Sequence, residues 1–524
     1  LKNFKLSKSA NADVISYSLE TDFVKNFYPP YPHSFNASVE IIFRDTDNDS
    51  LVSFNINPFS IKIQSVEGDA LLYKTEGERL TVKLKTPDKE GRYKIRIKYE
   101  HLNVEDGSFF VSPDILFTNN APEGTRNWMP SHDVPHDKAL FEIKARVPRK
   151  ITFASNGLLS DSAASDSTVI YHWKTTVPLA TYLITMAGSS EFLPDYFTVK
   201  EKGSGKEIPV RMYRKISDDP ASYFFVKGML EELNSYFSHK FGSYPFEKIG
   251  FVTLNEKFIY GGMENQTLIS LCDNCWNEIL VAHEFAHTWF GNKLTCLSWA
   301  DIWLNESFAR YSEALWSEAT NGSSGYLNHV LYTAQSYFDG KNSMPLYNGH
   351  WAFNTPGIDS LYDGSVIYDK GAAVLHMLRG VAGDSIFFNR IGEYLTRFGS
   401  DYGNASTADL IGVFNETGIT YLDQFFKQWL LYPAHPRYKI SYNTFTAGDS
   451  VKLAFELRQI QDTPPFIMDA EILVKYSDGT EELLTFLNEK KEEKKEFFLK
   501  AKPAKVIFDP YFRILLKEVN GKTL

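Results

Sequence analysis

The spacing of apolar residues changes twice along this chain of 524 residues, and these changes constrain its architecture more than any other feature. Up to about Met212 the apolar residues alternate with polar ones in short runs, as at residues 80–84 and 93–99. Such runs are typical of half-buried strands. From about Tyr213 to Leu431 the apolar spacing is helical, and after Pro433 the alternating pattern returns.

We therefore predict a multidomain α+β protein, since a chain of this length exceeds what one hydrophobic core can hold. The predicted domains are a large β domain over residues 1–212, a mostly α-helical domain over residues 213–433 and a small β-sandwich over residues 434–524. No large helical domain is expected after the middle one. Helices are predicted at residues 221–241, 277–290, 301–319, 366–379 and 385–398, and strands at 251–254 and 267–271.

The charge balance and the lengths of the apolar runs argue against two classes of protein. The net charge is −10, and the basic residues form no stripe, which argues against a nucleic-acid partner. No run of 18 apolar residues occurs, so no membrane span is predicted. The chain opens with Leu1 rather than with Met, which favours an exported protein, periplasmic or secreted, over a cytoplasmic one. The sequence leaves the oligomeric state open and favours a monomer.

The three cysteines leave two alternatives open. Cys272 and Cys275 form a C-x-x-C pair, and Cys296 stands apart. A structural zinc knuckle requires a second pair of ligands nearby, and the sequence offers none. We therefore expect either a local disulfide or two buried thiols.

Residues 283–287 have the sequence His-Glu-Phe-Ala-His, an H-E-x-x-H motif on the predicted helix 277–290. Positions i and i+4 lie on one face of a helix, so His283 and His287 can reach one zinc ion. Glu284 then lies beside the ion, where its carboxylate can take a proton from a bound water. The alternative is a pair of surface histidines. However, the helix is apolar on nearly every side, which predicts burial, and buried His and Glu side chains need partners such as a metal.

A catalytic zinc ion requires a third protein ligand and an open position for water. Glu306 lies on the next predicted helix, and two antiparallel helices joined by a short loop can bring it to the same ion. Glu313 lies two turns further along the same face. It is placed to bind the second nitrogen of a ligand histidine, and the alternative is an ordinary surface carboxylate.

Four strings of residues in this region form a recognisable set. They are Gly261-Gly262-Met263-Glu264-Asn265, the H-E-x-x-H motif running into Trp289-Phe290-Gly291-Asn292, Trp303-Leu304-Asn305-Glu306, and Tyr368-Asp369-Lys370-Gly371. Together they resemble the gluzincin aminopeptidases, a zinc peptidase family that includes alanyl aminopeptidase, aminopeptidase B and leukotriene A hydrolase. The resemblance extends from about residue 115 to residue 380. It implies that the middle domain has a thermolysin-like fold.

The resemblance also implies the roles of individual residues. His283, His287 and Glu306 would bind one Zn²⁺ ion, and Glu284 would be the general base. Tyr368 would donate a hydrogen bond to the oxyanion of the tetrahedral intermediate.

The string at residues 261–265 is expected to bind the substrate, a peptide with a free N-terminus. Glu264 would hold the α-ammonium group of that peptide. The backbone of Gly261 and Gly262 would align the peptide as an added strand. Met263 is expected to line the pocket for the N-terminal side chain, whose preferred type the sequence does not indicate.

The sequence departs from the family pattern at two positions of the site. Many relatives place a second amine-binding Gln or Glu five residues before the arginine that matches Arg126, where this chain has Ala121. Asn120 and Glu123 are the alternatives for that contact. Ser307 follows Glu306 where Gly is common, a change that we expect to matter little.

Three other functions are weighed against an aminopeptidase. A thermolysin-like endopeptidase shares the zinc chemistry, but it has no amine for Glu264 to bind. An epoxide hydrolase needs an enclosed tunnel, which the missing helical domain makes improbable. A catalytically silent scaffold could lose Glu284 or Tyr368 without harm, and both are present. The resemblance therefore implies a zinc aminopeptidase.

Overall fold

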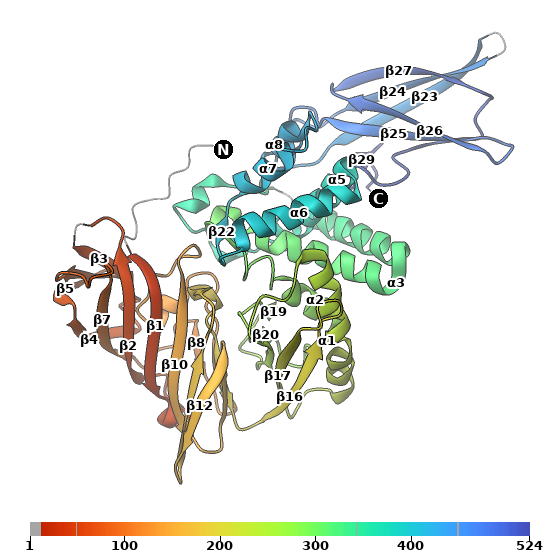
Figure 1. The fold of residues 1–524 in the computed structure, drawn as a ribbon. Helices are drawn as coiled ribbons and strands as arrows, with labels where there is room; N and C mark the ends of the chain where they lie inside the picture. The colour runs from red at the N-terminus through yellow and green to blue at the C-terminus, as the bar shows by residue number, and fades with distance from the viewer. Residues whose placement is uncertain (1–11, 49, 342, 448–449, 524) are drawn as a thin grey trace. The chain divides into compact units, whose positions relative to one another are not determined.

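The computed structural model describes residues 12–48, 50–341, 343–447 and 450–523 (Figure 1). Residues 1–11, with which the predicted N-terminal domain begins, lie outside the described residues. The chain divides into two compact units. The first comprises residues 1–299 and 395–406, and the second comprises residues 300–394 and 407–524.

The first unit opens with a large, mostly antiparallel sheet (Figure 1). Its strands, in spatial order, are β12 (Leu158–Ala164), β13 (Thr168–Lys174), β10 (Lys138–Pro148), β1 (Ala12–Asp22), β2 (Phe35–Asp45), β7 (Tyr93–His101) and β4 (Ile61–Gly68), and β14 (Leu179–Ala180) also pairs with β10. The pair β1–β10 is parallel, and the other pairs are antiparallel.

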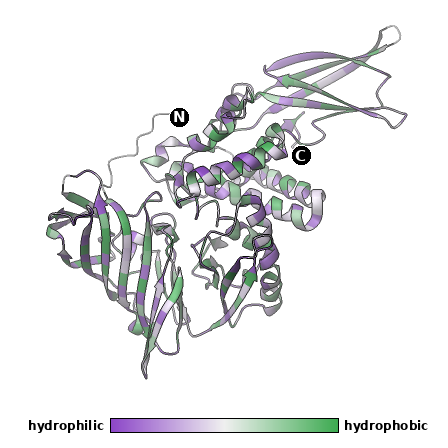
Figure 2. Cartoon of the chain, viewed as in Figure 1, coloured by the Kyte–Doolittle hydropathy of each residue, from purple (hydrophilic) through white to green (hydrophobic). Residues whose placement is uncertain are grey.

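Two smaller sheets complete this β-rich part. One contains β11 (Thr152–Ser155), β15 (Met186–Ser189), β9 (Ile115–Thr118) and β8 (Phe109–Val111), and the other contains β3 (Leu51–Asn55), β6 (Arg79–Leu84) and β5 (Ala70–Glu76). Apolar and polar residues alternate along β2 and β7, and the apolar ones are buried (Figure 2). The strands predicted at residues 80–84 and 93–99 are confirmed as β6 and β7.

A five-stranded sheet carries the central part of the first unit. Its order is β16 (Phe192–Lys200), β17 (Glu207–Lys215), β18 (Ile249–Thr253), β20 (Ile269–Leu271) and β19 (Gly262–Met263). The predicted boundary at residue 212 falls within β17. Both β16 and β17 hydrogen-bond into the sheet that holds β18.

Two helices accompany this sheet. α1 (Pro220–Phe241) begins at Asp219, whose carboxylate accepts hydrogen bonds from the backbone N–H groups of Ala221 and Ser222. α2 (Glu278–Ala286) is shorter than the predicted helix 277–290, because the chain turns at residues 287–289.

The second unit is helical up to residue 431. Its main elements are α3 (Trp303–Asp339), α4 (Ile358–Leu361), a π-helix (Gly364–Lys370), α5 (Gly371–Ala382), α7 (Thr407–Asn415) and α8 (Leu422–Leu431). α6 (Asp384–Gly399) begins in this unit and ends in residues 395–406 of the first unit, which also contain β22 (Asn404–Ala405). α3 is kinked at Gly322, where φ is 66°. This kink explains why apolar spacing predicts a helix that ends near residue 319.

The described residues after α8 form strands. They are arranged as one sheet of β27 (Glu492–Leu499), β24 (Ser450–Gln459), β23 (Arg437–Ala447) and β29 (Glu518–Val519), and one of β26 (Glu481–Asn488), β25 (Met468–Lys475) and β28 (Lys505–Phe508). The predicted fold class is therefore confirmed, with a β-rich start, a helical middle and a β-sheet end. Among the described helices, none combines the length and the apolar character that crossing a bilayer requires.

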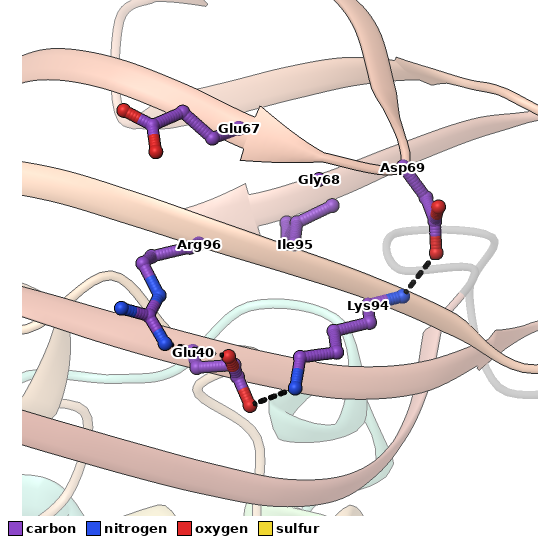
Figure 3. A pocket seen from close by; sticks show the side chains of 7 residues that line it. All are labelled: Glu40, Glu67, Gly68, Asp69, Lys94, Ile95 and Arg96. Atoms are coloured by element: carbon purple, nitrogen blue, oxygen red, sulfur yellow. Dashed lines mark hydrogen bonds and ion pairs between the residues drawn. The ribbon is translucent and has the colours of Figure 1, made fainter.

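A surface pocket on the large sheet of the first unit is lined by charged residues (Figure 3). Glu40 forms ion pairs with Lys94 at 2.6 Å and with Arg96 at 2.9 Å. Asp69 accepts a hydrogen bond from the backbone N–H of Lys94 at 2.8 Å. Glu67 pairs with Lys98 at 2.9 Å. The charged side chains of Glu40, Lys94 and Arg96 are thus paired with one another, and none of the residues that line the pocket belongs to the predicted active site.

Candidate active site

The H-E-x-x-H motif begins on α2, which is capped by the side chain of Asn277. The side-chain oxygen of Asn277 accepts hydrogen bonds of 3.0 Å from the N–H groups two and three residues further on, which satisfies two donors at the helix start. His283, Glu284 and His287 are all buried. The burial predicted from the apolar character of this helix is confirmed for the motif.

The two histidines of the motif face one another, with their Nε2 atoms 3.2 Å apart. Nδ1 of His287 is 2.9 Å from the carbonyl oxygen of Phe290. Because a carbonyl only accepts hydrogen bonds, this contact places the His287 proton on Nδ1 and directs the Nε2 lone pair toward His283. Two nitrogen atoms bound tetrahedrally to one zinc ion lie about 3.3 Å apart. The pair therefore fits the spacing of two zinc ligands.

A second carboxylate lies beside the motif. Glu264, Glu284 and His287 are buried, and one ligand atom of each lies within 4.8 Å of the others. Glu264 directly follows β19. A Cβ atom on Gly262 would lie 2.5 Å from Cδ of Glu284, so glycine is required for this strand to come so close to the carboxylate.

In the described part of the chain, β19 is an edge strand of its sheet. It pairs with β20, with Gly262 opposite Leu271 and Met263 opposite Ser270. An edge strand presents backbone donors and acceptors to which an extended peptide can hydrogen-bond. Of the two glycines predicted to align a peptide, Gly262 lies on this edge strand and Gly261 directly precedes it.

A disulfide bond lies next to this edge strand. Cys272 and Cys275 are bridged, which decides between the two alternatives that the sequence leaves open. The backbone N–H of Cys272 donates to the carbonyl of Gly261 at 2.9 Å. Cys296 is buried and takes no part in the disulfide.

Buried polar contacts fix the segment that follows the motif. Nδ2 of Asn292 donates to the carbonyl of Glu264 at 2.8 Å. Nζ of Lys138 donates to the carbonyl oxygens of Asn292 at 2.8 Å and Lys293 at 3.2 Å. Burial lowers the pKa of Lys138 to about 7. These contacts connect the backbone of Glu264 to the segment at residues 292–293, which follows the motif.

In the second unit, Glu306 lies buried in the first turn of α3. Ser307 donates a hydrogen bond from Oγ to the carbonyl of Ile367 at 2.7 Å. Tyr368 lies half-buried on the π-helix, and such turns are frequent at functional sites. The Ser307 hydroxyl thus connects the turn of Glu306 to the turn of Tyr368, a contact that glycine could not make.

Glu313 also lies in the second unit, where its buried carboxylate is 2.8 Å from Nη1 of Arg310 and 3.1 Å from Nε2 of His329. The second nitrogen of His287 is bonded to the carbonyl of Phe290 instead. The predicted contact between Glu313 and a ligand histidine stays a prediction.

The two alternatives for a second amine contact are both occupied in structural roles. Asn120 donates to the carbonyl of Ile184 at 2.6 Å and accepts from Nε1 of Trp128 at 2.8 Å. Glu123 accepts from Nε1 of Trp299 at 3.0 Å and pairs with Arg126, also at 3.0 Å.

The neighbouring Asn119 is different. It is 8% exposed, and its Oδ1 atom has no hydrogen-bond partner within the described part of the chain. Such a buried acceptor is able to take a hydrogen bond from a bound donor, and no motif in the sequence singles out Asn119.

Two family models match the chain. Residues 15–183 match the peptidase M1 N-terminal domain, and residues 224–429 match the peptidase family M1 domain. The chain belongs to peptidase family M1. This confirms the predicted membership of the gluzincin aminopeptidases.

Curated relatives of this M1 chain include proteins named as aminopeptidases. Probable aminopeptidase 1 of Sulfurisphaera tokodaii is 25% identical over 423 residues, which make up 77% of this chain and 52% of that protein. Aminopeptidase N of Oryctolagus cuniculus is 32% identical over 311 residues, which make up 54% of this chain and 31% of that protein. The M1 chain thus spans about half the length of these relatives or less.

Solved structures share its fold. The M1 zinc metallopeptidase of Deinococcus radiodurans is similar with a TM-score of 0.70 and 21% identity, covering 82% of this chain and 96% of that one. Aminopeptidase A of Legionella pneumophila, solved with aspartic acid, is similar with a TM-score of 0.81 and 16% identity, covering 99% of this chain and 60% of that one.

Proposed function

We propose that this M1 chain is a zinc metallo-aminopeptidase that hydrolyses the N-terminal peptide bond of peptides with a free N-terminus. The observation that carries the proposal is the arrangement around His287. Nε2 of His287 lies 3.2 Å from Nε2 of His283. The carboxylates of Glu264 and Glu284 form a buried cluster with the same imidazole. The arrangement supplies metal ligands, a base and an anion for an ammonium group in one place.

His283, His287 and Glu306 are proposed to hold the zinc ion. The spacing of the two Nε2 atoms and the tautomer of His287 support the first two ligands. Glu306 is among the buried side chains with the chemistry of a metal ligand. Two imidazoles and a carboxylate, with one position left for water, form a common ligand set of catalytic zinc. Bound zinc would polarise the scissile carbonyl and make water acidic enough to react near neutral pH.

The protein groups then move the protons and hold the charge. Glu284 accepts the proton of the attacking water and passes it to the nitrogen of the leaving amine. Tyr368 donates a hydrogen bond to the developing oxyanion, a contribution of about 3 kcal/mol for one well-placed donor. Glu313 supports the site from α3, where Arg310 and His329 hold its carboxylate in place.

Glu264 makes the reaction specific for the end of a peptide. Its buried carboxylate favours an α-ammonium group beside the scissile bond and disfavours a continuing chain. Asn119 is the side chain near Ala121 that is proposed to accept a second hydrogen bond from the ammonium group, since its Oδ1 is buried and without a partner among the described residues. Gly261 and Gly262 align the peptide backbone, and Met263 lines the pocket for the first side chain.

One assay separates this proposal from the other functions. The purified protein is expected to cleave aminoacyl-arylamides and free peptides and to leave N-acetylated peptides intact. A chelator of zinc is expected to abolish cleavage, and added Zn²⁺ is expected to restore it, because the proposed reaction requires the bound zinc ion. Cleavage of N-acetylated peptides at internal bonds would instead identify an endopeptidase. Absence of any cleavage by the zinc-loaded protein would support a silent scaffold.

A further inference from the structure

The hairpin that carries Glu264 turns at residues 265–268 in a conformation that its sequence disfavours. The backbone N–H of Leu268 donates to the carbonyl of Asn265 at 3.1 Å, which closes the turn between β19 and β20. Within this turn Thr267 has a φ of 63°. The left-handed region is rare for a β-branched residue because its side chain crowds the backbone. Surrounding contacts must therefore hold the turn.

One of these contacts comes from the N-terminal β-rich part. Asn156 directly follows β11 and is fully buried. Its Nδ2 atom donates to the carbonyl oxygens of Gln266 at 2.6 Å and Leu183 at 3.0 Å, and its Oδ1 atom accepts from the N–H of Thr185 at 2.7 Å. The side-chain amide of Asn156 thus connects the turn to residues 183–185 of the β-rich part.

Two further residues hold Thr267 itself, and a third leaves room for its backbone. The N–H of Gly157 donates to Oγ1 of Thr267 at 2.8 Å, and Nζ of the buried Lys248 donates to the same atom at 3.3 Å. On the other side, a Cβ atom on Gly250 would lie 3.0 Å from the carbonyl carbon of Thr267, so glycine leaves the room that the turn occupies.

We propose that Asn156, together with the N–H of Gly157, is a positioning element for substrate recognition. By fixing the turn at residues 265–268, it keeps the carboxylate of Glu264 beside Glu284 and His287, where the ammonium group of the peptide binds. The N-terminal β-rich part would then contribute to the selection of free N-termini without touching the substrate. This inference rests on the proposed function, because it takes Glu264 as the amine-binding residue.

A pair of inhibitors tests this role. Leucine hydroxamate and 4-methylpentanoyl hydroxamate both bind zinc through the hydroxamate and differ only in the α-amine. The ratio of their inhibition constants therefore reports the amine contact. The wild-type protein is expected to bind the amine-bearing compound at least about tenfold more tightly, and Asn156→Ala to remove most of that preference. Glu264→Ala is the reference variant, in which the preference is expected to vanish.

Asn26→Ala is the matched control. Asn26 is also fully buried, and its Nδ2 atom donates to two carbonyl oxygens, of Pro32 at 2.7 Å and Ser34 at 3.1 Å. We expect this control to lose thermal stability and to keep the wild-type ratio of inhibition constants. An equal loss of the ratio in both variants would mean that general destabilisation is responsible, and would overturn the proposal.

A second pair of variants keeps the test decisive if Asn156→Ala folds poorly. Thr267→Val keeps the shape of the side chain but removes the acceptor for Gly157, so the amine preference is expected to fall. Thr267→Ser keeps that acceptor and is expected to retain the preference. A folded Asn156→Ala or Thr267→Val protein with the wild-type ratio would refute the positioning role. No amine preference in the wild-type protein would refute the role of Glu264 instead.

Discussion

Substitution of Glu284 by glutamine is expected to lower kcat by roughly 10²–10⁴-fold, the usual contribution of a general base. Glutamine keeps the size of the side chain but cannot take a proton from water. Because Glu284 is proposed as the base and not as a ligand, the zinc content of the variant should equal that of the wild-type protein. The measurement is kcat on an aminoacyl-arylamide, with metal analysis of the same sample.

Glu278→Gln is the control for this variant. Glu278 lies in the first turn of the same helix, outside the motif, so we expect nearly wild-type kcat. If Glu284→Gln retains wild-type turnover, Glu284 is not the base. If it loses zinc together with turnover, the carboxylate acts in metal binding.

Removal of the Glu264 carboxylate is expected to weaken the use of free-amine substrates most. Truncating one partner of a buried ion pair typically costs about 2–5 kcal/mol, which corresponds to a loss in kcat/KM of roughly 30-fold or more. Glu264→Ala should therefore lower kcat/KM strongly while the protein keeps its zinc. It should also lose the preference for leucine hydroxamate over the compound without the amine.

Glu256→Ala removes an exposed carboxylate from the loop before β19 and serves as the control. It tests whether the effect comes from one specific group or from a change in the net charge near the site. Similar losses in both variants, or unchanged kinetics of Glu264→Ala, would reject the anchoring role.

The sequence predicts those parts of the fold that short-range patterns encode. The helix predicted at residues 221–241 is α1, which starts one residue earlier because the Asp219 carboxylate caps Pro220–Phe241. The helix predicted at residues 366–379 is divided in the structure into the π-helix and α5. Apolar spacing shows which face is buried, but it does not distinguish between the backbone hydrogen bonds of π- and α-helical turns.

The sequence does not predict which sheet a strand joins. β16 and β17 alternate like the strands before them, so spacing alone assigns them to the N-terminal domain with its boundary at residue 212. β17 pairs with β18 in the central sheet, and β16 pairs with β17. Partner choice depends on contacts between distant residues, and a local pattern contains no record of these. The domain boundaries remain predictions.

The same limit applies to the site. The motif at residues 283–287 and the string at 261–265 are contiguous, so the sequence identifies them. Asn156, Lys138 and Asn119 belong to no motif, and nothing in their local sequence distinguishes them from other polar residues. Asn156 and Lys138 are recognised only in the structure, because their contacts are with residues far along the chain. Asn119 is recognised there because its Oδ1 atom has no hydrogen-bond partner among the described atoms.

The proposed reaction requires that His283, His287 and Glu306 bind a single zinc ion. Crystals of the zinc-loaded protein, measured on both sides of the zinc absorption edge, test it directly. We expect one anomalous peak at about 2.0–2.2 Å from both Nε2 atoms and from an oxygen of Glu306. A peak that touches the histidines but lies beyond bonding distance of Glu306, or a peak bound elsewhere, would contradict it.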